Sequence, residues 1–206
     1  MPADPNVPSA CGAANPWITR SSTPKYDNPW IHVVEHQVIN PRGGPAIYGT
    51  VHFKNLATGV VPLEPDGATY LVGQFRYALA CYSWEIPEGG GQRGRDPVEA
   101  ARRELLEETG LVAVHWQKLL ELHLSNSVTD EHAFAYLAWG LEQHEARPEE
   151  AELLEVRRLP FSRVLAMVLS GEITDAITVA SILKVQVLAM RGRLPNGLGE
   201  AVLKSG

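Results

Sequence analysis

Three glutamates near the middle of the chain could perform chemistry together. Glu104, Glu107 and Glu108 are spaced i, i+3 and i+4, so on a helix their carboxylates share one face. At about 5 Å and an effective dielectric near 20, each pair of these charges repels by roughly 3 kcal/mol. If the face is partly buried, a hard cation such as Mg²⁺ can neutralise it and keep positions open for waters and phosphates. The other interpretation is a solvated acidic helix surface.

A helix that would carry these glutamates is predicted over residues 97–109. Asp96 is a typical N-cap, Pro97 suits the first helical position, and Glu99 completes a variant of the capping box. Gly110 is typical of the position after a helix C-terminus. Glycines 89–91 precede the helix, and such a glycine-rich segment lets the backbone come close to the predicted site.

Apolar patterning predicts the elements around this helix. Strands are expected on its N-terminal side over 31–39, 46–54, 60–63, 69–77 and 82–86, and on its C-terminal side over 112–124, 132–141 and 153–159. Two further helices are expected over 161–170 and 175–190. This order predicts a mixed α/β or α+β fold and not a regular βαβ alternation.

Length and composition indicate one globular domain with irregular ends. We expect a proline-rich flexible arm over 1–29, one domain over 30–191 and a flexible tail over 192–206. The net charge of −6 argues against a nucleic-acid partner. The start shows no secretory signal, and no apolar run approaches the roughly 20 residues of a membrane span, so we expect no membrane partner and a cytoplasmic location.

The residues around the glutamates form a longer pattern. Gly89, Arg103-Glu104-Leu105, Glu107-Glu108 and Gly110-Leu111 resemble the signature of the Nudix hydrolases, G-x5-E-x7-R-E-U-x-E-E-x-G-U, where U is aliphatic. One position departs, because Arg95 stands where the signature has its first glutamate. In the family that glutamate supports the motif's arginine more than it holds metal. The departure therefore puts local geometry in question and leaves a catalytically inactive relative as an alternative.

The resemblance extends over roughly residues 30–191. Residues 71–77, 84–89 and 171–176 are similar to the Nudix subgroup that hydrolyses ADP-ribose and nucleoside diphosphate sugars. This resemblance implies an α/β/α sandwich built on a mixed β-sheet, with a catalytic loop-helix. It also implies a homodimer whose subunits exchange N-terminal strands.

Site residues follow from the resemblance at the matching positions. The implied metal ligands are Glu104, Glu107, Glu108 and the backbone carbonyl of Glu88, holding Mg²⁺, with Mn²⁺ as a substitute. Arg103 would orient the glutamates and act with Glu108 in catalysis. Arg76 would meet phosphate or sugar oxygens, and Glu85 belongs to the same substrate-binding group.

Three further positions carry open alternatives. A carboxylate from the acidic loop after the later strands would act as general base, with Glu150 or Glu152 favoured, unless this loop is merely solvated. Glu131 is a candidate sugar or metal-shell contact or part of an ordinary polar loop. Trp30 could stack on a nucleobase across a dimer, or pack in a core or dimer interface.

The expected activity is Mg²⁺-dependent hydrolysis of a nucleoside diphosphate sugar to a nucleoside monophosphate and a sugar phosphate. ADP-ribose-specific relatives commonly carry a proline shortly after the signature, and residues 98–147 contain none, which raises GDP-mannose as a substrate. Two alternatives remain: a regulatory module that binds a nucleotide sugar without cleaving it, and a structural protein with an acidic helix face.

Overall fold

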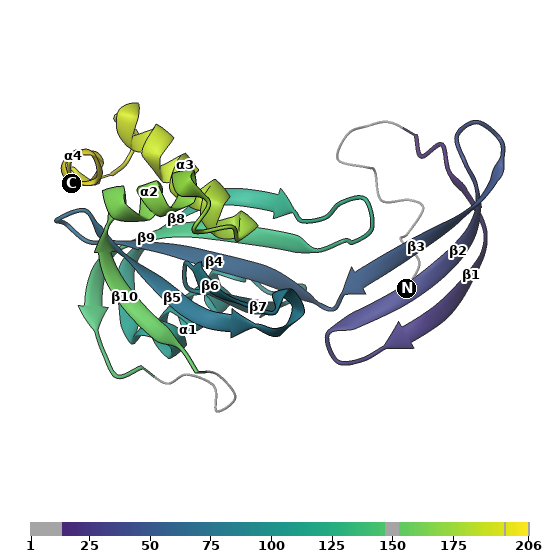
Figure 1. The fold of residues 1–206 in the computed structure, drawn as a ribbon, viewed down its shortest axis with the longest axis horizontal. Coiled ribbons are helices and arrows are strands. Elements are labelled where there is room, and N and C mark those ends of the chain that lie inside the picture. The colour runs from purple at the N-terminus through teal and green to yellow at the C-terminus, as the bar shows by residue number, and fades with distance from the viewer. Residues whose placement is uncertain (1–13, 147–152, 196, 206) are drawn as a thin grey trace. The chain divides into compact units, whose positions relative to one another are not determined.

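The computed structural model describes residues 14–146, 153–195 and 197–205, and the chain divides into two compact units (Figure 1). Unit 1 comprises Met1–Lys54 and Ser125–Asp130, and unit 2 comprises Asn55–Leu124 and Glu131–Gly206. The N-terminal division falls after Lys54, not at residue 30 as the composition suggested. The strands expected over 31–39 and 46–54 thus belong to unit 1.

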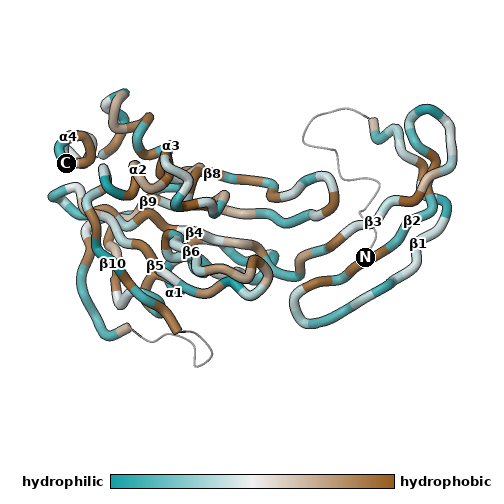
Figure 2. Tube along the Cα trace, viewed as in Figure 1, coloured by the Kyte–Doolittle hydropathy of each residue, from teal (hydrophilic) through white to brown (hydrophobic). Residues whose placement is uncertain are grey.

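Unit 1 is a three-stranded antiparallel sheet in the order β1-β2-β3, with bounds Ile18–Asp27, Ile31–Ile39 and Pro45–Phe53. Val51 of β3 also forms a parallel bridge with Thr129, which brings the segment 125–130 beside this strand. The prediction of a flexible arm is wrong for β1. Its residues are exposed and mostly hydrophilic (Figure 2), so hydropathy gave no signal for a strand held by backbone pairing with β2.

Unit 2 contains a seven-stranded mixed sheet. Five strands follow the order β10-β5-β4-β9-β8, while β6 pairs with β5 and β7 pairs with β4. The β4–β9 pair is parallel and the other pairs are antiparallel. The strand bounds are Asn55–Leu63 for β4, Ala68–Arg76 for β5, Cys81–Glu85 for β6, Glu88–Gln92 for β7, Leu111–His123 for β8, His132–Gln143 for β9 and Glu155–Pro160 for β10.

Helices cover both faces of this sheet. Along β4, Val60 belongs to the cluster that contains α1 residues, whereas the next residue, Val61, belongs to the cluster built with α2, α3 and α4. Successive strand residues point to opposite faces, so α1 lies on one face and the other helices on the opposite one. The bounds are Pro97–Thr109 for α1, Phe161–Ser170 for α2, Ala176–Met190 for α3 and Leu198–Lys204 for α4; a short 3-10 helix spans Tyr77–Leu79. The predicted α/β/α sandwich is confirmed.

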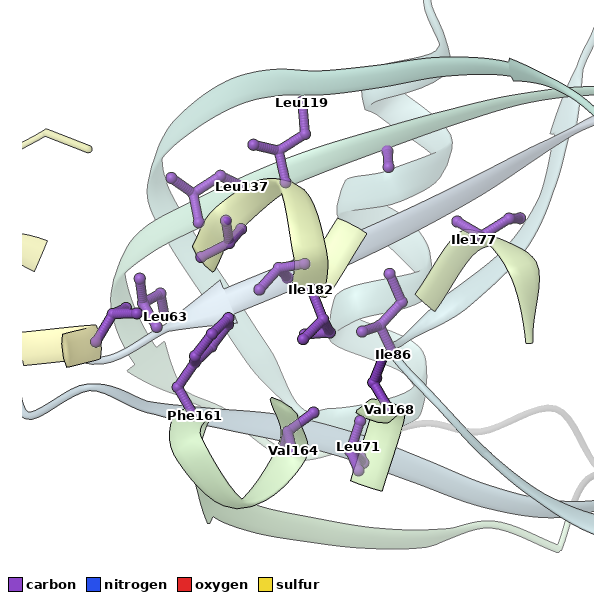
Figure 3. Close-up of a cluster of buried hydrophobic side chains, with 14 of the residues drawn as sticks. Leu63, Leu71, Ile86, Leu119, Leu137, Phe161, Val164, Val168, Ile177 and Ile182 are labelled. Atoms are coloured by element: carbon purple, nitrogen blue, oxygen red, sulfur yellow. The ribbon is translucent and has the colours of Figure 1, made fainter. Parts of the chain in front are cut away.

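The larger core lies between the sheet and helices α2–α4. Figure 3 shows Phe161 of α2 and Ile182 of α3 among Leu63, Leu71 and Leu137 from the strands, and all five are inaccessible to solvent. The C-terminal segment contributes Leu198 and Val202 of α4 to the same core. The prediction of a flexible tail over 192–206 is therefore wrong for α4, since the apolar side of this short helix is buried.

None of the helices in the described ranges combines the length and apolar character needed to cross a membrane.

Candidate active site

Helix α1 begins and ends at the predicted residues. Asp96 caps it by accepting a hydrogen bond from the Val98 N–H at 3.1 Å, and Pro97 is its first residue. Gly110 follows the helix in the left-handed region, with φ at +73°, and its N–H donates to Leu106 O. The caps thus fix the length of the helix that carries the three glutamates.

The glycine-rich segment before α1 is a strand, β7, where the sequence suggested only an approach loop. It pairs antiparallel with β4, and Gly59 lies opposite Glu88. A Cβ added to Gly89 would lie 2.2 Å from Cδ of Glu104 and 2.4 Å from its Oε1. Glycine at this position therefore lets the backbone approach the Glu104 carboxylate. A side chain on any other residue would collide with that carboxylate.

The glutamates of α1 are shielded from solvent to different degrees. Glu108 is 4% exposed, and one of its carboxylate oxygens accepts the Glu88 N–H at 3.0 Å. The side chains of Glu104 and Glu107 are 13% and 29% exposed. A solvated acidic surface is therefore the wrong description for Glu104 and Glu108.

Arg103 lies between two of these carboxylates, at the position from which it was predicted to orient them. Its Nη2 donates to Glu104 Oε1 and to the Gly90 carbonyl, both at 2.7 Å, and its Nη1 donates to Glu107 Oε2 at 3.3 Å. The guanidinium thus joins α1 to β7. Arg95, which replaces the signature glutamate, instead donates to Gln92 Oε1 at 3.3 Å in the turn before α1.

The donors at this place fit a hard divalent cation in chemistry. The side chains supply carboxylate oxygens, and the close contact of Gly89 with Glu104 brings the backbone of β7 to them. Within the described ranges, no three His, Cys, Asp or Glu side chains are gathered closely enough to form a ready metal site. Glu104, Glu107, Glu108 and the Glu88 carbonyl are the groups that would hold such a cation.

A second group of charged residues adjoins β7. The guanidinium of Arg76 forms a bidentate ion pair with Glu85, with Nε at 3.0 and 3.1 Å from the two carboxylate oxygens, and Nη2 lies 3.4 Å from Glu88 Oε1. The Glu85 side chain is 4% exposed and that of Glu88 is 10% exposed. The sequence predicted Arg76 and Glu85 as substrate contacts, and the structure brings them together as ion-pair partners.

The two carboxyls of this group differ in their titration. Burial raises the pKa of Glu88 well above its usual value, and the nearby charges of Asp175 and Glu85 raise it further. Burial opposes ionisation of Glu85 too, but hydrogen bonds from Arg76 and Glu88 outweigh it and hold the pKa of Glu85 below its usual value. Glu88 Oε2 is buried without a hydrogen-bond partner in the described residues.

The remaining predicted residues lie on other elements. Trp30 belongs to unit 1, in the turn between β1 and β2, and is 66% exposed, so the interpretation as a core residue is wrong. Glu131 immediately precedes β9 and is half-buried, and its carbonyl accepts from Leu124 N–H at 3.1 Å. Glu150 and Glu152 lie outside the described residues.

Sequence reasoning missed two contributors to this region. The Glu88 side chain was overlooked because the resemblance assigns only its backbone carbonyl. Thr178 of α3 was also missed, although its Oγ1 accepts the Ile86 N–H at 3.0 Å. A threonine three residues after the cap Asp175 is the signal that could have drawn attention to it, since this turn packs against another element.

Strand β7 is rich in glycine and leads into the capped helix α1, which carries the buried glutamates. This is the loop-helix type of site that the signature describes. Family comparison agrees: residues 54–178 match the model of the NUDIX domain, and residues 17–51 match the nucleoside diphosphate sugar hydrolase N-terminal domain. The chain belongs to the Nudix family, as an enzyme of its pyrophosphatase branch. The boundary between the two matches agrees with the division between units 1 and 2.

The chain is similar to individual members of this family and to a solved structure. The chain is 35% identical over 167 residues to the ADP-ribose pyrophosphatase of Mycobacterium tuberculosis, covering 79% of each protein. It is 33% identical over 135 residues to the GDP-mannose pyrophosphatase of Yersinia enterocolitica, covering 61% of this chain and 70% of the relative. A crystal structure of an ADP compounds hydrolase aligns with a TM-score of 0.76 at 20% identity, over 86% of this chain and 97% of that one, and supports the fold alone.

Proposed function

We propose that this enzyme hydrolyses the pyrophosphate bond of a nucleoside diphosphate sugar in a Mg²⁺-dependent reaction. The products are a nucleoside monophosphate and a sugar phosphate. The observation that carries the proposal is the burial of Glu104 and Glu108 against β7, within the residues that match the family signature. Relatives named for ADP-ribose and GDP-mannose support the substrate class.

The chemistry must overcome the negative charge of the diphosphate, which repels a nucleophile. Glu104, Glu107, Glu108 and the Glu88 carbonyl would hold Mg²⁺, which would neutralise this charge and activate a water molecule for attack. Arg103 keeps two of the carboxylates in place through its hydrogen bonds. Glu108 additionally holds the Glu88 N–H, so the same side chain fixes the backbone ligand beside it.

Substrate binding and proton transfer fall to other residues. Arg76 Nη1 has no hydrogen-bond partner among the described residues, while its Nε and Nη2 are engaged by Glu85 and Glu88. We assign this open edge to a phosphate or sugar oxygen of the substrate. Glu150 or Glu152 remains the proposed general base, with Glu131 as the next candidate.

A panel of ADP-ribose, GDP-mannose and UDP-glucose, incubated with Mg²⁺ or with EDTA, tests the proposal. We expect at least one compound to yield a nucleoside monophosphate and a sugar phosphate, with EDTA abolishing the reaction. Binding without cleavage of any compound would contradict hydrolysis and favour a regulatory module. Cleavage that persists in EDTA would contradict the metal requirement.

We also propose that the protein is a homodimer that uses unit 1. Several large apolar side chains of this unit are exposed, namely Trp17, Ile18, Tyr26, Trp30 and Ile47. Aromatic residues of this kind are enriched in protein interfaces. Analytical ultracentrifugation should show twice the chain mass of 22.5 kDa, and Trp30→Ser with Tyr26→Ser should weaken the dimer. A monomeric wild type at micromolar concentration would overturn this part of the proposal.

A further inference from the structure

The segment that leads into β7 is held by three separate elements of unit 2. Residues 86 and 87 connect β6 to β7, which begins at Glu88, and one backbone group of each of the residues 86–88 is hydrogen-bonded to α3, β4 or α1. The bonds are Ile86 N–H to Thr178 Oγ1 at 3.0 Å, Val60 N–H to the Pro87 carbonyl at 2.9 Å, and Glu88 N–H to Glu108 Oε2 at 3.0 Å. The partners on β4 and α1 belong to elements that already form the site. The third partner, Thr178, lies on α3, which the site description did not include.

Thr178 is a buried side chain in the first turn of α3. It is inaccessible to solvent, and its own N–H donates to Asp175 Oδ2 at 2.7 Å. The Ile86 N–H therefore meets a fixed hydroxyl oxygen, on a helix whose start is itself capped. A buried N–H needs such a partner because water cannot replace it there.

The packing around this bond leaves little room for the segment to move. A Cβ added to Gly59 of β4 would lie 2.8 Å from Ile177 Cγ2 and 3.0 Å from Ile86 Cδ1. Figure 3 shows Ile86 and Ile177 among the buried side chains of this core. The start of α3, the residue before Pro87, and β4 thus meet in close contact.

We propose that Thr178 is a positioning residue for the candidate metal site. By fixing the Ile86 N–H, it sets the orientation of the Pro87–Glu88 backbone and hence the direction of the Glu88 carbonyl. The proline ring restricts its own φ and disfavours helical backbone at Ile86, so few free rotations separate the anchored Ile86 N–H from the Pro87–Glu88 peptide. This inference rests on the proposed function only in taking the Glu88 carbonyl as a metal ligand.

A set of threonine variants separates positioning from stability. Thr178→Val keeps the side-chain shape and removes the acceptor, Thr178→Ser keeps the acceptor, and Thr69→Val removes an equally buried hydroxyl that donates to the Pro62 carbonyl at 2.8 Å. We expect Thr178→Val to need about tenfold more Mg²⁺ for half-maximal turnover and to bind Mn²⁺ about tenfold more weakly. Thr178→Ser should stay within about threefold of the wild type in both measures, and Thr69→Val should keep the wild-type metal requirement. A folded Thr178→Val protein with wild-type Mn²⁺ affinity would overturn the proposal.

Amide hydrogen exchange of the wild type tests the same coupling without a variant, should Thr178→Val fail to fold. If metal binding and the Thr178 bond stabilise the same backbone orientation, saturating Mg²⁺ alone should slow exchange of the Ile86 amide. The Thr69 amide serves as the internal control for stabilisation of the whole unit, and exchange of the Ile86 amide should slow more than exchange of the Thr69 amide. Unchanged Ile86 exchange in saturating Mg²⁺ would overturn the positioning role. Absent hydrolysis combined with slowed Ile86 exchange would instead contradict the proposed function and leave this inference standing.

Discussion

The two sheets of this protein differ sharply in what they bury. In unit 2, β4 is almost wholly buried, and its two faces contribute to two separate clusters beneath helices. In unit 1, every residue of β1 is exposed, and Val38 is the one buried residue in the part of this unit that the structure describes. A rigid site needs neighbours on every side, and among the described residues the buried charges all lie in unit 2.

The two family matches correspond to these two kinds of packing. The NUDIX match covers the packed sandwich with its buried glutamates, and the N-terminal match covers the open sheet. Backbone pairing and surface ion pairs such as Lys54–Asp27 at 2.6 Å hold the open sheet, since it has almost no core. Changes in unit 2 should therefore alter turnover and stability, and changes in unit 1 should act mainly on assembly.

The largest effect is expected at Glu108. Glu108→Gln removes a charge from the proposed metal site while retaining an amide that still accepts the Glu88 N–H. We expect turnover to fall by about a thousandfold, which corresponds to about 4 kcal/mol of transition-state stabilisation. Steady-state hydrolysis of the best nucleotide sugar provides the measurement.

Glu99→Gln is the matched control for this change. Glu99 lies on the same helix but is exposed in its first turn. It should keep wild-type turnover. Equal activity in the Glu108→Gln and wild-type proteins would remove Glu108 from the site and with it the functional contrast between the two units.

Truncation of a buried side chain should lower the free energy of unfolding more in unit 2 than in unit 1. Phe161 is fully buried in the larger cluster of unit 2, so Phe161→Ala should lower the free energy of unfolding by about 3–5 kcal/mol. Val38→Ala, the nearest equivalent in unit 1, should cost about 2 kcal/mol or less because fewer apolar atoms leave a core. Urea denaturation followed by far-UV circular dichroism measures both. Similar losses for the two variants would mean that unit 1 has a core of comparable importance.

A smaller effect concerns the pH dependence of stability. The pKa of Glu88 is raised in the folded protein, chiefly by burial, so folding favours its protonated form. Its contribution is fully present below the unfolded pKa of about 4.5 and is lost as pH rises through the folded pKa. In metal-free buffer, Glu88→Gln should therefore be more stable than the wild type at pH 8, and the difference should vanish near pH 4.

Asp27 in unit 1 gives the opposite sign. A hydrogen bond from Lys54 lowers the pKa of this exposed carboxyl, so its contribution is present above the unfolded pKa and is lost as pH falls. Asp27→Asn should be slightly less stable than the wild type at pH 8, with no difference at very low pH. Chemical denaturation at pH values from 3 to 8 compares the two variants. The same sign for both would contradict the burial argument for Glu88.

Local sequence signals predicted those elements whose ends are set by residues next to them in the chain. Asp96, Pro97 and Gly110 fixed both ends of α1, and Asp175 capped α3 as expected. The strand β7 escaped prediction because three successive glycines are typical of a loop, and only pairing with β4 makes them a strand. The strand β1 escaped because its exposed polar side chains carry no alternation.

Prediction of the site was limited in the same way, because local sequence signals do not predict contacts between distant residues. The spacing of Glu104, Glu107 and Glu108 predicted a shared helix face, and the structure places two of them against β7. The ion pair of Arg76 with Glu85 could not be predicted, because it depends on how β5 and β6 pair across the 3-10 helix between them. The Thr178 bond to Ile86 joins residues 92 positions apart and depends on tertiary packing alone.

Metal binding tests the central claim most directly, because it does not depend on knowing the substrate. Mn²⁺ binding, followed by electron paramagnetic resonance, can be compared among the wild type, Glu104→Gln, Glu108→Gln and the control Glu99→Gln. We predict that wild type and Glu99→Gln bind with equal affinity, and that the other two variants bind at least about tenfold more weakly. Equal affinity in all four proteins, or no binding by the wild type, would contradict a cation held by the buried carboxylates of α1.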